Sequence, residues 1–260
     1  MKASVILIEE PESHLSFSRL SELMGVVEKA ASGRQIIAST HSSFVANKLG
    51  LENLILLSDD NCCSMQSLEK ETFEFFKKVA GYDTLRLILC KKSILVEGDS
   101  DELVVQRAYM DTHEGRLPIQ DGIDVMTVGG VTFKRYLEIA QTLNKETAVV
   151  TDNDGNIESV KKKYKEYEKT PCIHICVDEV VDTGDLKLSD KDFNYNTLEP
   201  KILKENGRDV MNKIFGTNYD ADDEMHKYMY THKTDCAIAI FESATKIKYP
   251  EYIMRAIKNE

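Results

Sequence analysis

Two short apolar segments, each followed at once by carboxylates, constrain the fold more than any other feature of the sequence. In SILVEGDSDE, residues 93–102, the apolar run ends at Glu97, and Gly98 permits a sharp turn before acidic residues open a helix. In AVVTDNDGN, residues 148–156, the run ends in Asp152 and Asp154. Because open parallel sheets place their sites at the carboxyl ends of strands, the two segments predict a shared site at one sheet edge.

The remainder of the chain alternates between short β-branched runs and stretches with helical spacing. This alternation predicts an α/β fold, a parallel sheet flanked by helices. The expected strands are residues 4–8, 35–38, 53–57, 93–97, 123–128, 148–152 and 172–177, and the expected helices among them are 15–31, 69–79, 101–113, 131–143 and a lysine-rich helix to about 169. After residue 196 the pattern is helical: 198–204, 209–215, 221–230, 233–244 and 250–258.

Composition limits the class of protein. The 260 residues are 42% hydrophobic and 30% charged, which is typical of a globular protein. No apolar run approaches the roughly 20 residues of a membrane helix, and six scattered cysteines do not form a disulfide framework, so we expect a cytoplasmic protein without a membrane partner. The net charge of −11 disfavours a DNA-coating protein but not a nucleic-acid enzyme whose carboxylates hold cations.

The strand-end acids have the spacing of a metal site. Glu97 and Asp101 are four residues apart across the strand-to-helix turn, and both can reach one ion. Asp152 and Asp154 alternate along an extended chain and are expected to point to the same side. Four carboxylates together repel unless cations bind, and oxygen ligands without histidine or cysteine favour Mg²⁺ or Mn²⁺. The competing interpretation is that each acid lies in a solvated turn or helix start.

The first forty residues carry a different pattern. VILIEEPE places Glu9 and Glu10 at a strand end, and QIIASTHS delivers His41 at the end of the next strand. This resembles the back half of an ABC-type ATPase head, which implies that Glu9 assists magnesium, Glu10 activates water and His41 senses the γ-phosphate. The alternative is an acidic strand end with a capping histidine.

The phosphate-binding half of such a head is missing from the sequence. No G-x-x-x-x-G-K-[ST] loop occurs in it, so the backbone amides and the lysine that anchor the phosphates are lacking. ATP is therefore expected as a cofactor only together with a missing Walker A region, and autonomous ATP hydrolysis is not expected.

The pattern E-G-x-x-D followed by D-x-D on strand ends resembles the TOPRIM domain of topoisomerases, primases and certain nucleases. With an ATPase-head segment before it, the order resembles the C-terminal part of the OLD (overcoming lysogenisation defect) family of ATP-coupled nucleases, which includes the nuclease subunit of the Gabija antiphage system. The resemblance divides the chain into a partial ATPase head at 1–85, a TOPRIM core at 90–195 and a helical part at 196–260 that completes the site.

The resemblance implies a DNA endonuclease that uses two Mg²⁺ or Mn²⁺ ions, acts in antiphage defence and is controlled by an ATPase head. Glu97 and Lys233 would be catalytic. Glu97, Asp101 and Asp152 would hold the first ion, with Asp154 and Glu199 serving the second. The competing interpretation of Lys233 is a solvent-exposed lysine at the start of a helix. The competing interpretation of Glu199 is an acid at a helix N-terminus, where the helix dipole favours it.

The expected partners are DNA, further copies of the chain and a helicase-like defence protein. Two other functions stay open at this point. The acids could bind metal structurally in a regulatory or assembly module, or they could position a nucleoside triphosphate for primase-like nucleotidyl transfer. The metal dependence and the products of the reaction separate these functions.

Overall fold

The computed structural model describes residues 5–58, 61–66, 68–78, 84–129, 132–188 and 190–258. The chain forms two compact units, Met1–Leu89 and Cys90–Glu260, and each is described by itself. The finer division at 85/90 and 195/196 stays a prediction, and residues 79–83, near the first of these boundaries, lie outside the described residues. Residue 4, the expected start of the first strand, lies outside them as well.

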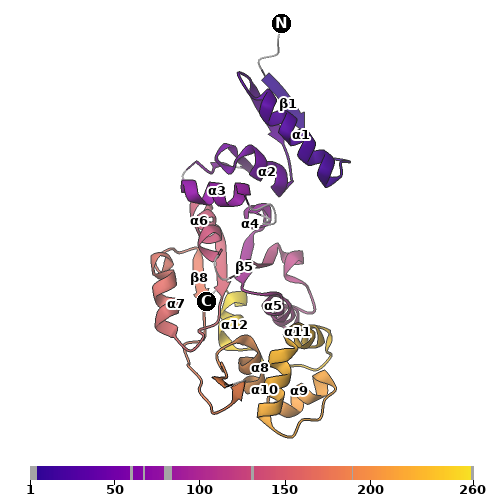
Figure 1. Ribbon diagram of the computed structural model, residues 1–260, viewed down its shortest axis with the longest axis vertical. Helices are drawn as coiled ribbons and strands as arrows, with labels where there is room; N and C mark the ends of the chain where they lie inside the picture. The colour runs from indigo at the N-terminus through magenta and orange to yellow at the C-terminus, as the bar shows by residue number, and fades with distance from the viewer. Residues whose placement is uncertain are drawn as a thin grey trace. The chain divides into compact units, whose positions relative to one another are not determined.

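The first unit begins with two parallel strands, β1 (Val5–Glu9) and β2 (Gln35–Ser39). Helix α1 (Phe17–Ala30) connects them and packs Leu20 and Met24 against Val45 of α2 (Ser43–Leu49) (Figure 1). The unit continues with the 3-10 turn η1 (Leu51–Asn53), an antiparallel pair β3 (Ile55–Ser58) and β4 (Asn61–Ser64), and helices α3 (Lys70–Lys78) and α4 (Thr84–Leu89). This unit therefore contains the strand–helix–strand order expected from the sequence.

The second unit is built on a four-stranded, wholly parallel sheet in the order β6-β5-β7-β8. The strands are β5 (Lys92–Val96), β6 (Ile123–Thr127), β7 (Glu146–Val150) and β8 (Ile173–Cys176). Every residue of β5 is buried, as expected for a central strand that has helices on both faces. The predicted α/β class with a helix-flanked parallel sheet is thus confirmed.

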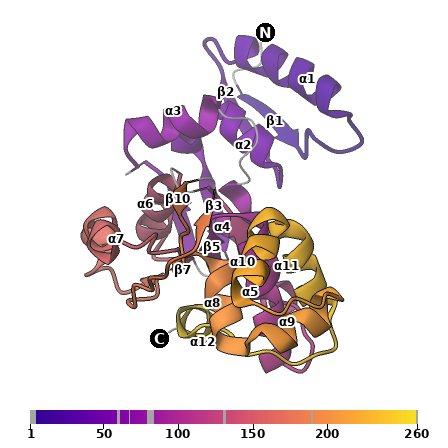
Figure 2. The same cartoon turned by 60° about the horizontal axis from the view of Figure 1, so that its bottom comes forward.

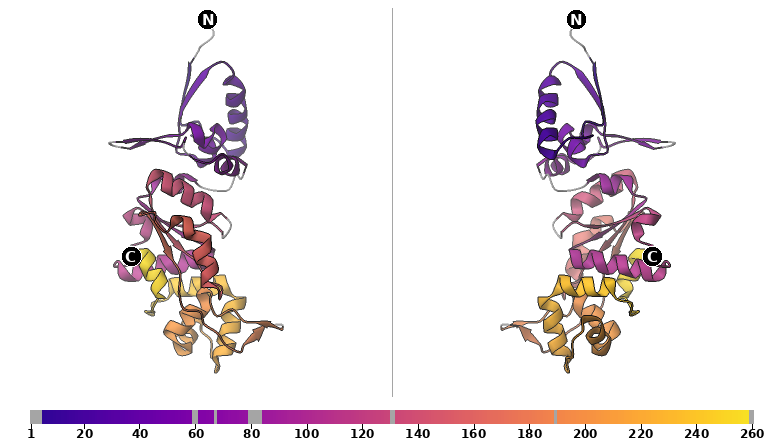
Figure 3. Two further views of the ribbon diagram at one scale, coloured as in Figure 1. Left: turned by 90° about the vertical axis from the view of Figure 1, so that its left-hand side faces the viewer. Right: turned by 90° about the vertical axis from the view of Figure 1, so that its right-hand side faces the viewer.

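Helices cover both faces of this sheet (Figure 3). On one face Ile94 and Val150 belong to a core shared with α5 (Asp99–Thr112) and α12 (Glu251–Lys258). Leu95 and Val149 alternate with them and so point to the other face. That face carries α6 (Phe133–Leu143), which contacts β7 and β8. Helix α7 (Ile157–Tyr164) and the 3-10 turn η3 (Lys165–Tyr167) lead on to β8, so the lysine-rich helix ends before residue 169.

The C-terminal residues form a group of helices that extends the same core (Figure 2). They are α8 (Leu198–Asn206), α9 (Arg208–Phe215), α10 (Asp222–Thr231) and α11 (Lys233–Glu242), and α11 packs along α5. Ile202, Met225 and Ile240 lie in one cluster with the sheet residues. The predicted helical C-terminal region is therefore confirmed, and it is continuous with the core of the sheet.

Several elements differ from the expectation. Helix α1 begins at Phe17 rather than Leu15, because Ser16 has the extended conformation of a residue that precedes a helix. Helices α2 and α4, the turn η2 (Pro118–Asp121) and the short antiparallel pair β9 (Lys187–Leu188) and β10 (Lys191–Asp192) were not predicted. In the described part of the chain, no helix is long and apolar enough to cross a membrane.

Candidate metal centre

The strand order places a topological switch point where the predicted site should be. β5 is the first strand of this sheet along the chain. The next strand, β6, pairs on one side of β5, and β7 pairs on the other side. The carboxyl ends of β5 and β7 are therefore a topological switch point, where open α/β sheets bind ligands. Glu97 directly follows β5, and Asp152 lies two residues after β7. The two sequence segments thus meet at this edge.

Glu97 is oriented by a residue of the neighbouring strand. The hydroxyl of Thr151, which directly follows β7 and is buried, donates a hydrogen bond to Oε1 of Glu97. The charge of Glu97 also helps to raise the pKa of Tyr164, for which burial is the larger cause. Glu97 therefore projects from the end of β5 toward the end of β7.

Asp101 lies in the first turn of α5, where its Oδ2 accepts a hydrogen bond of 3.0 Å from the backbone N–H of Gly98. This is the carboxylate half of a capping arrangement and fixes the side chain over the strand end. Burial and then the charge of Glu199 raise the pKa of Asp101 to about 7, with a smaller contribution from Glu97. The Gly98 hydrogen bond and the charge of Lys233 act in the opposite direction.

Asp152 is also held away from its ionised form by its surroundings. Burial raises its pKa well above the ordinary value, and the charges of Asp101, Glu97 and Glu199 raise it further. Asp154 contributes the smallest increase. Four carboxyl groups from β5, β7, α5 and α8 therefore lie within electrostatic reach of one another.

Asp154 lies in a turn rather than in the extended chain that the alternation assumed. Its backbone is left-handed, with φ of 48°, so the chain has left the extended conformation at this residue. The side chain is exposed, and its Oδ1 accepts a hydrogen bond of 2.9 Å from Asn194. Asp154 thus lies at the rim of the carboxylate group.

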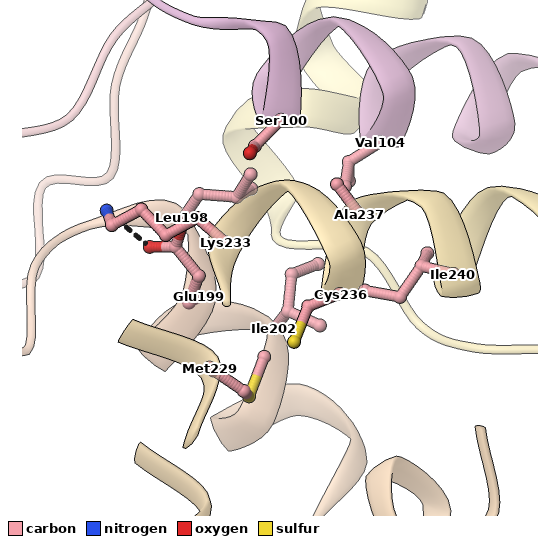
Figure 4. A pocket seen from close by; sticks show the side chains of 10 residues that line it. All are labelled: Ser100, Val104, Leu198, Glu199, Ile202, Met229, Lys233, Cys236, Ala237 and Ile240. Carbon is pink, nitrogen blue, oxygen red and sulfur yellow. Dashed lines mark hydrogen bonds and ion pairs between the residues drawn. The ribbon is translucent and has the colours of Figure 1, made fainter. Parts of the chain in front are cut away.

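Glu199 and Lys233 form the part of the site that comes from the C-terminal helices (Figure 4). Glu199 is in the first turn of α8 and is 7% exposed, and Lys233 is the first residue of α11. Nζ of Lys233 lies 3.0 Å from Oε2 of Glu199, while 43% of the lysine side chain is exposed. Beneath this pair is a small cavity with apolar walls, lined by Val104, Leu198, Ile202, Met229, Ala237 and Ile240 among others.

A buried ion network holds α8 in place. Nζ of Lys201, whose side chain is 4% exposed, lies 2.6 Å from Asp178 and 2.7 Å from Asp182. Lys204 binds the other oxygen of Asp182 at 2.6 Å. Asp178 follows β8 closely, so the network ties α8, and with it Glu199, to the carboxyl end of the sheet.

The donor set suits a hard divalent cation. It consists of carboxylate oxygens, and burial together with mutual repulsion disfavours the ionised forms of Asp101 and Asp152 unless positive charge is added. Within the described ranges, no three His, Cys, Asp or Glu side chains are already arranged as a ligand set for one ion. Binding would therefore require side-chain rotation among these acids.

The ATPase-like residues lie together at the ends of β1 and β2. Oε1 of Glu10 is 3.3 Å from Nε2 of His41, and Glu9, the last residue of β1, is exposed. Glu12, which the sequence did not single out, accepts hydrogen bonds from the Thr40 hydroxyl at 2.7 Å and from the His41 backbone N–H at 2.8 Å. Glu12 thus fixes the turn that carries His41.

The carboxylates thus lie at the switch point of a helix-flanked parallel sheet. Residues 88–154 match the family model described as "Overcoming lysogenization defect protein-like, TOPRIM domain". Residues 1–47 match the family model described as "AAA domain, putative AbiEii toxin, Type IV TA system". The resemblance to the C-terminal part of an OLD family protein is thereby confirmed.

Solved structures of OLD proteins are also similar. The C-terminal region of the Xanthomonas campestris pv. campestris OLD protein is 20% identical, with a TM-score of 0.44 over 66% of this chain and 93% of that chain. The C-terminal region of the Burkholderia pseudomallei OLD protein is 16% identical, with a TM-score of 0.40, and the match covers 65% of this chain and 96% of that chain. No curated protein matches the sequence at a significant level.

Proposed function

We propose that the chain is a divalent-metal-dependent endonuclease that hydrolyses phosphodiester bonds in DNA. One observation carries this proposal: Glu97, Asp101, Asp152 and Glu199 couple electrostatically at the switch point of the sheet, with Lys233 paired to Glu199. The match of residues 88–154 to a TOPRIM family model supports it. We further propose two Mg²⁺ or Mn²⁺ ions, with Asp154 serving the second from the rim.

Each residue has a role that follows from its surroundings. Bound metal would supply a hydroxide nucleophile and neutralise the leaving 3′-oxygen. Thr151 holds Glu97 toward the switch point. Asp101 and Asp152 provide oxygen ligands once added positive charge stabilises their ionised forms. Lys233 has enough exposed surface to leave Glu199 and place its ammonium group beside a phosphate oxygen.

Nicking of supercoiled plasmid DNA tests the proposal. We expect nicking or linear product with Mg²⁺ or Mn²⁺, none with EDTA, and a loss of about 100-fold or more in Glu97→Gln. Glu158→Gln, an exposed acid on α7, is the matched control and should cut normally. An active Glu97→Gln variant would exclude the proposed site.

The biological setting is part of the proposal. We propose a role in antiphage defence, in the cytoplasm, with control by a complete ATPase head and assembly with further copies and a helicase-like partner. The chain should be tested both alone and with a complete ATPase head restored. Metal binding without DNA cleavage in both forms would favour a regulatory or assembly module. Nucleotide incorporation on a primed template would favour primase-like transfer.

A further inference from the structure

Helix α12 runs antiparallel to the strands of the sheet. Lys92, the first residue of β5, is buried and donates hydrogen bonds from Nζ to the carbonyl oxygens of Ala256 at 2.5 Å and Ile257 at 3.3 Å. The last turn of α12 is therefore held at the amino end of the sheet. Arg255 reaches the other way and donates to the carbonyl oxygen of Val177, just beyond β8, at 2.6 Å. The first turn of α12, with Tyr252, consequently lies toward the carboxyl ends of the strands, where the acids are.

The hydroxyl of Tyr252 is buried without a protein partner. The residue is 2% exposed, and its Oη accepts or donates no hydrogen bond among the residues that the structure describes. Two other tyrosines of the same cluster differ, one buried and one partly buried: the hydroxyl of Tyr109 binds Asp121 at 2.8 Å, and that of Tyr249 binds Asp111 at 2.6 Å. A buried hydroxyl without a partner costs about 1–3 kcal/mol, so such groups usually face water or a ligand.

The charges that act on this hydroxyl belong mainly to carboxylates of the site. Burial raises the pKa of Tyr252, and the charges that raise it further belong first to Asp152 and then to Asp101, Asp178 and Glu199. The hydroxyl is thus within electrostatic reach of these acids but beyond direct hydrogen-bonding distance. An ordered water can join a buried hydroxyl to carboxylates that lie beyond direct hydrogen-bonding distance.

We propose that Tyr252 is a positioning residue whose hydroxyl hydrogen-bonds to a water held between Asp152 and Asp101 and thereby strengthens divalent-cation binding at the site. This inference rests on the proposed metal-dependent function. It adds a residue from the last helix, far in sequence from every predicted ligand. Because Tyr252 acts through water and carboxylates, its effect appears in cation affinity before it appears in chemistry.

Isothermal titration of the 260-residue chain with Mn²⁺ tests this inference on wild type, Tyr252→Phe and Tyr249→Phe. Outer partners of metal ligands typically contribute 10- to 100-fold in affinity, so we expect Tyr252→Phe to weaken Mn²⁺ binding by about tenfold. Tyr249→Phe is the matched control: it removes a hydroxyl that binds Asp111 instead, and it should leave Mn²⁺ affinity unchanged.

Thermal unfolding without metal supplies the second readout. Removing a hydroxyl that has no protein partner should leave the melting temperature of Tyr252→Phe equal to that of wild type or above it. A folded Tyr252→Phe variant with wild-type Mn²⁺ affinity would overturn the inference, and so would a variant that no longer folds.

The titrations also separate this inference from the proposed function. If wild type binds Mn²⁺ and cuts DNA while Tyr252→Phe binds equally well, the role of Tyr252 alone is wrong. If wild type binds Mn²⁺ more tightly than Tyr252→Phe but neither protein cuts DNA, the result supports the role of Tyr252 and contradicts the proposed nuclease function. If wild type binds no Mn²⁺, both are wrong.

Discussion

The ammonium group of Lys233 lies 3.0 Å from the carboxylate of Glu199 and joins two helices whose residues are 34 positions apart. Lys233 also lowers the pKa of Asp101, against the burial and the Glu199 charge that raise it. The lysine is thus a countercharge for the carboxylate group when no metal is bound. A cation that replaces it in this role would free the lysine for substrate phosphate.

Replacement of Lys233 by methionine should abolish cleavage while it preserves the fold. Glu199, which is buried, loses its ammonium partner and keeps the Thr197 hydroxyl at 3.3 Å, so we expect a destabilisation of about 1–3 kcal/mol and a loss of plasmid nicking of about 100-fold or more. Lys213→Met, on the exposed side of α9, is the control and should nick normally. Nicking at the wild-type rate by Lys233→Met would show that the lysine has only a structural role.

Asp152→Asn should weaken metal binding and raise the stability of the metal-free protein. Burial and four neighbouring carboxylates disfavour the charge of Asp152, so its removal should raise the melting temperature of the metal-free protein. The increase in melting temperature that Mn²⁺ gives wild type should then be lost. Asp154→Asn should change the metal-free melting temperature less, because Asp154 is exposed. A melting temperature of metal-free Asp152→Asn below that of wild type would contradict the proposed repulsion between Asp152 and the other carboxylates.

Thr151→Val should weaken metal binding through Glu97. Valine keeps the shape of the buried side chain but cannot donate to Oε1 of Glu97, so Mn²⁺ affinity should fall by about 10-fold or more. Thr147→Val, within β7, is a matched control, because its hydroxyl binds Ser93 at 2.8 Å, away from the acids. Equal Mn²⁺ affinities of the two variants would argue against an orienting role of Thr151.

The network around Lys201 should make stability fall in acid. Burial alone would raise the pKa of Asp182, but hydrogen bonds from Lys201 and Lys204 outweigh it and lower the pKa. A carboxyl group with a lowered folded-state pKa stabilises the protein above its unfolded pKa of about 4, and the contribution disappears as the pH falls through the folded value.

Urea unfolding between neutral pH and the acid limit of the folded state measures this contribution. The free-energy difference between wild type and Asp182→Asn should be constant near neutral pH and should shrink below pH about 4. Asp190→Asn, an exposed acid, is the control and should show a smaller difference. A difference for Asp182→Asn that is independent of pH would show that this carboxylate is not stabilised by its lysines.

The strands and their terminal acids could be predicted because each is a local pattern: an apolar run, an acid and a turn. The position of Asp154 could not be predicted, since alternation assumes an extended chain and the backbone is left-handed at this residue. Glu199 and Lys233 were proposed only through the family resemblance, because no local pattern links two helix starts. Thr151 did carry a signal, its place directly before Asp152 at a strand end.

Tyr252 and Lys201 carried no sequence signal. Tyr252 is one apolar position on an amphipathic helix, and its nearness to the acids depends on Lys92 fixing the far end of that helix. Lys201 is one of many lysines, and only the packing of α8 against the segment after β8 buries it between two aspartates. Both depend on tertiary packing between elements distant in sequence.

The route of α12 has a consequence for synthesis of the protein. Lys92 is synthesised before the carbonyl groups that it binds, because Ala256 and Ile257 follow it by 164 and 165 residues. Until α12 is synthesised, Lys92 of β5 lacks the two carbonyl groups that accept its hydrogen bonds in the folded protein. The core behind Lys233 and Glu199 also lacks this helix. A nascent chain that already contains the strand-end acids therefore lacks a completed centre until α12 has docked.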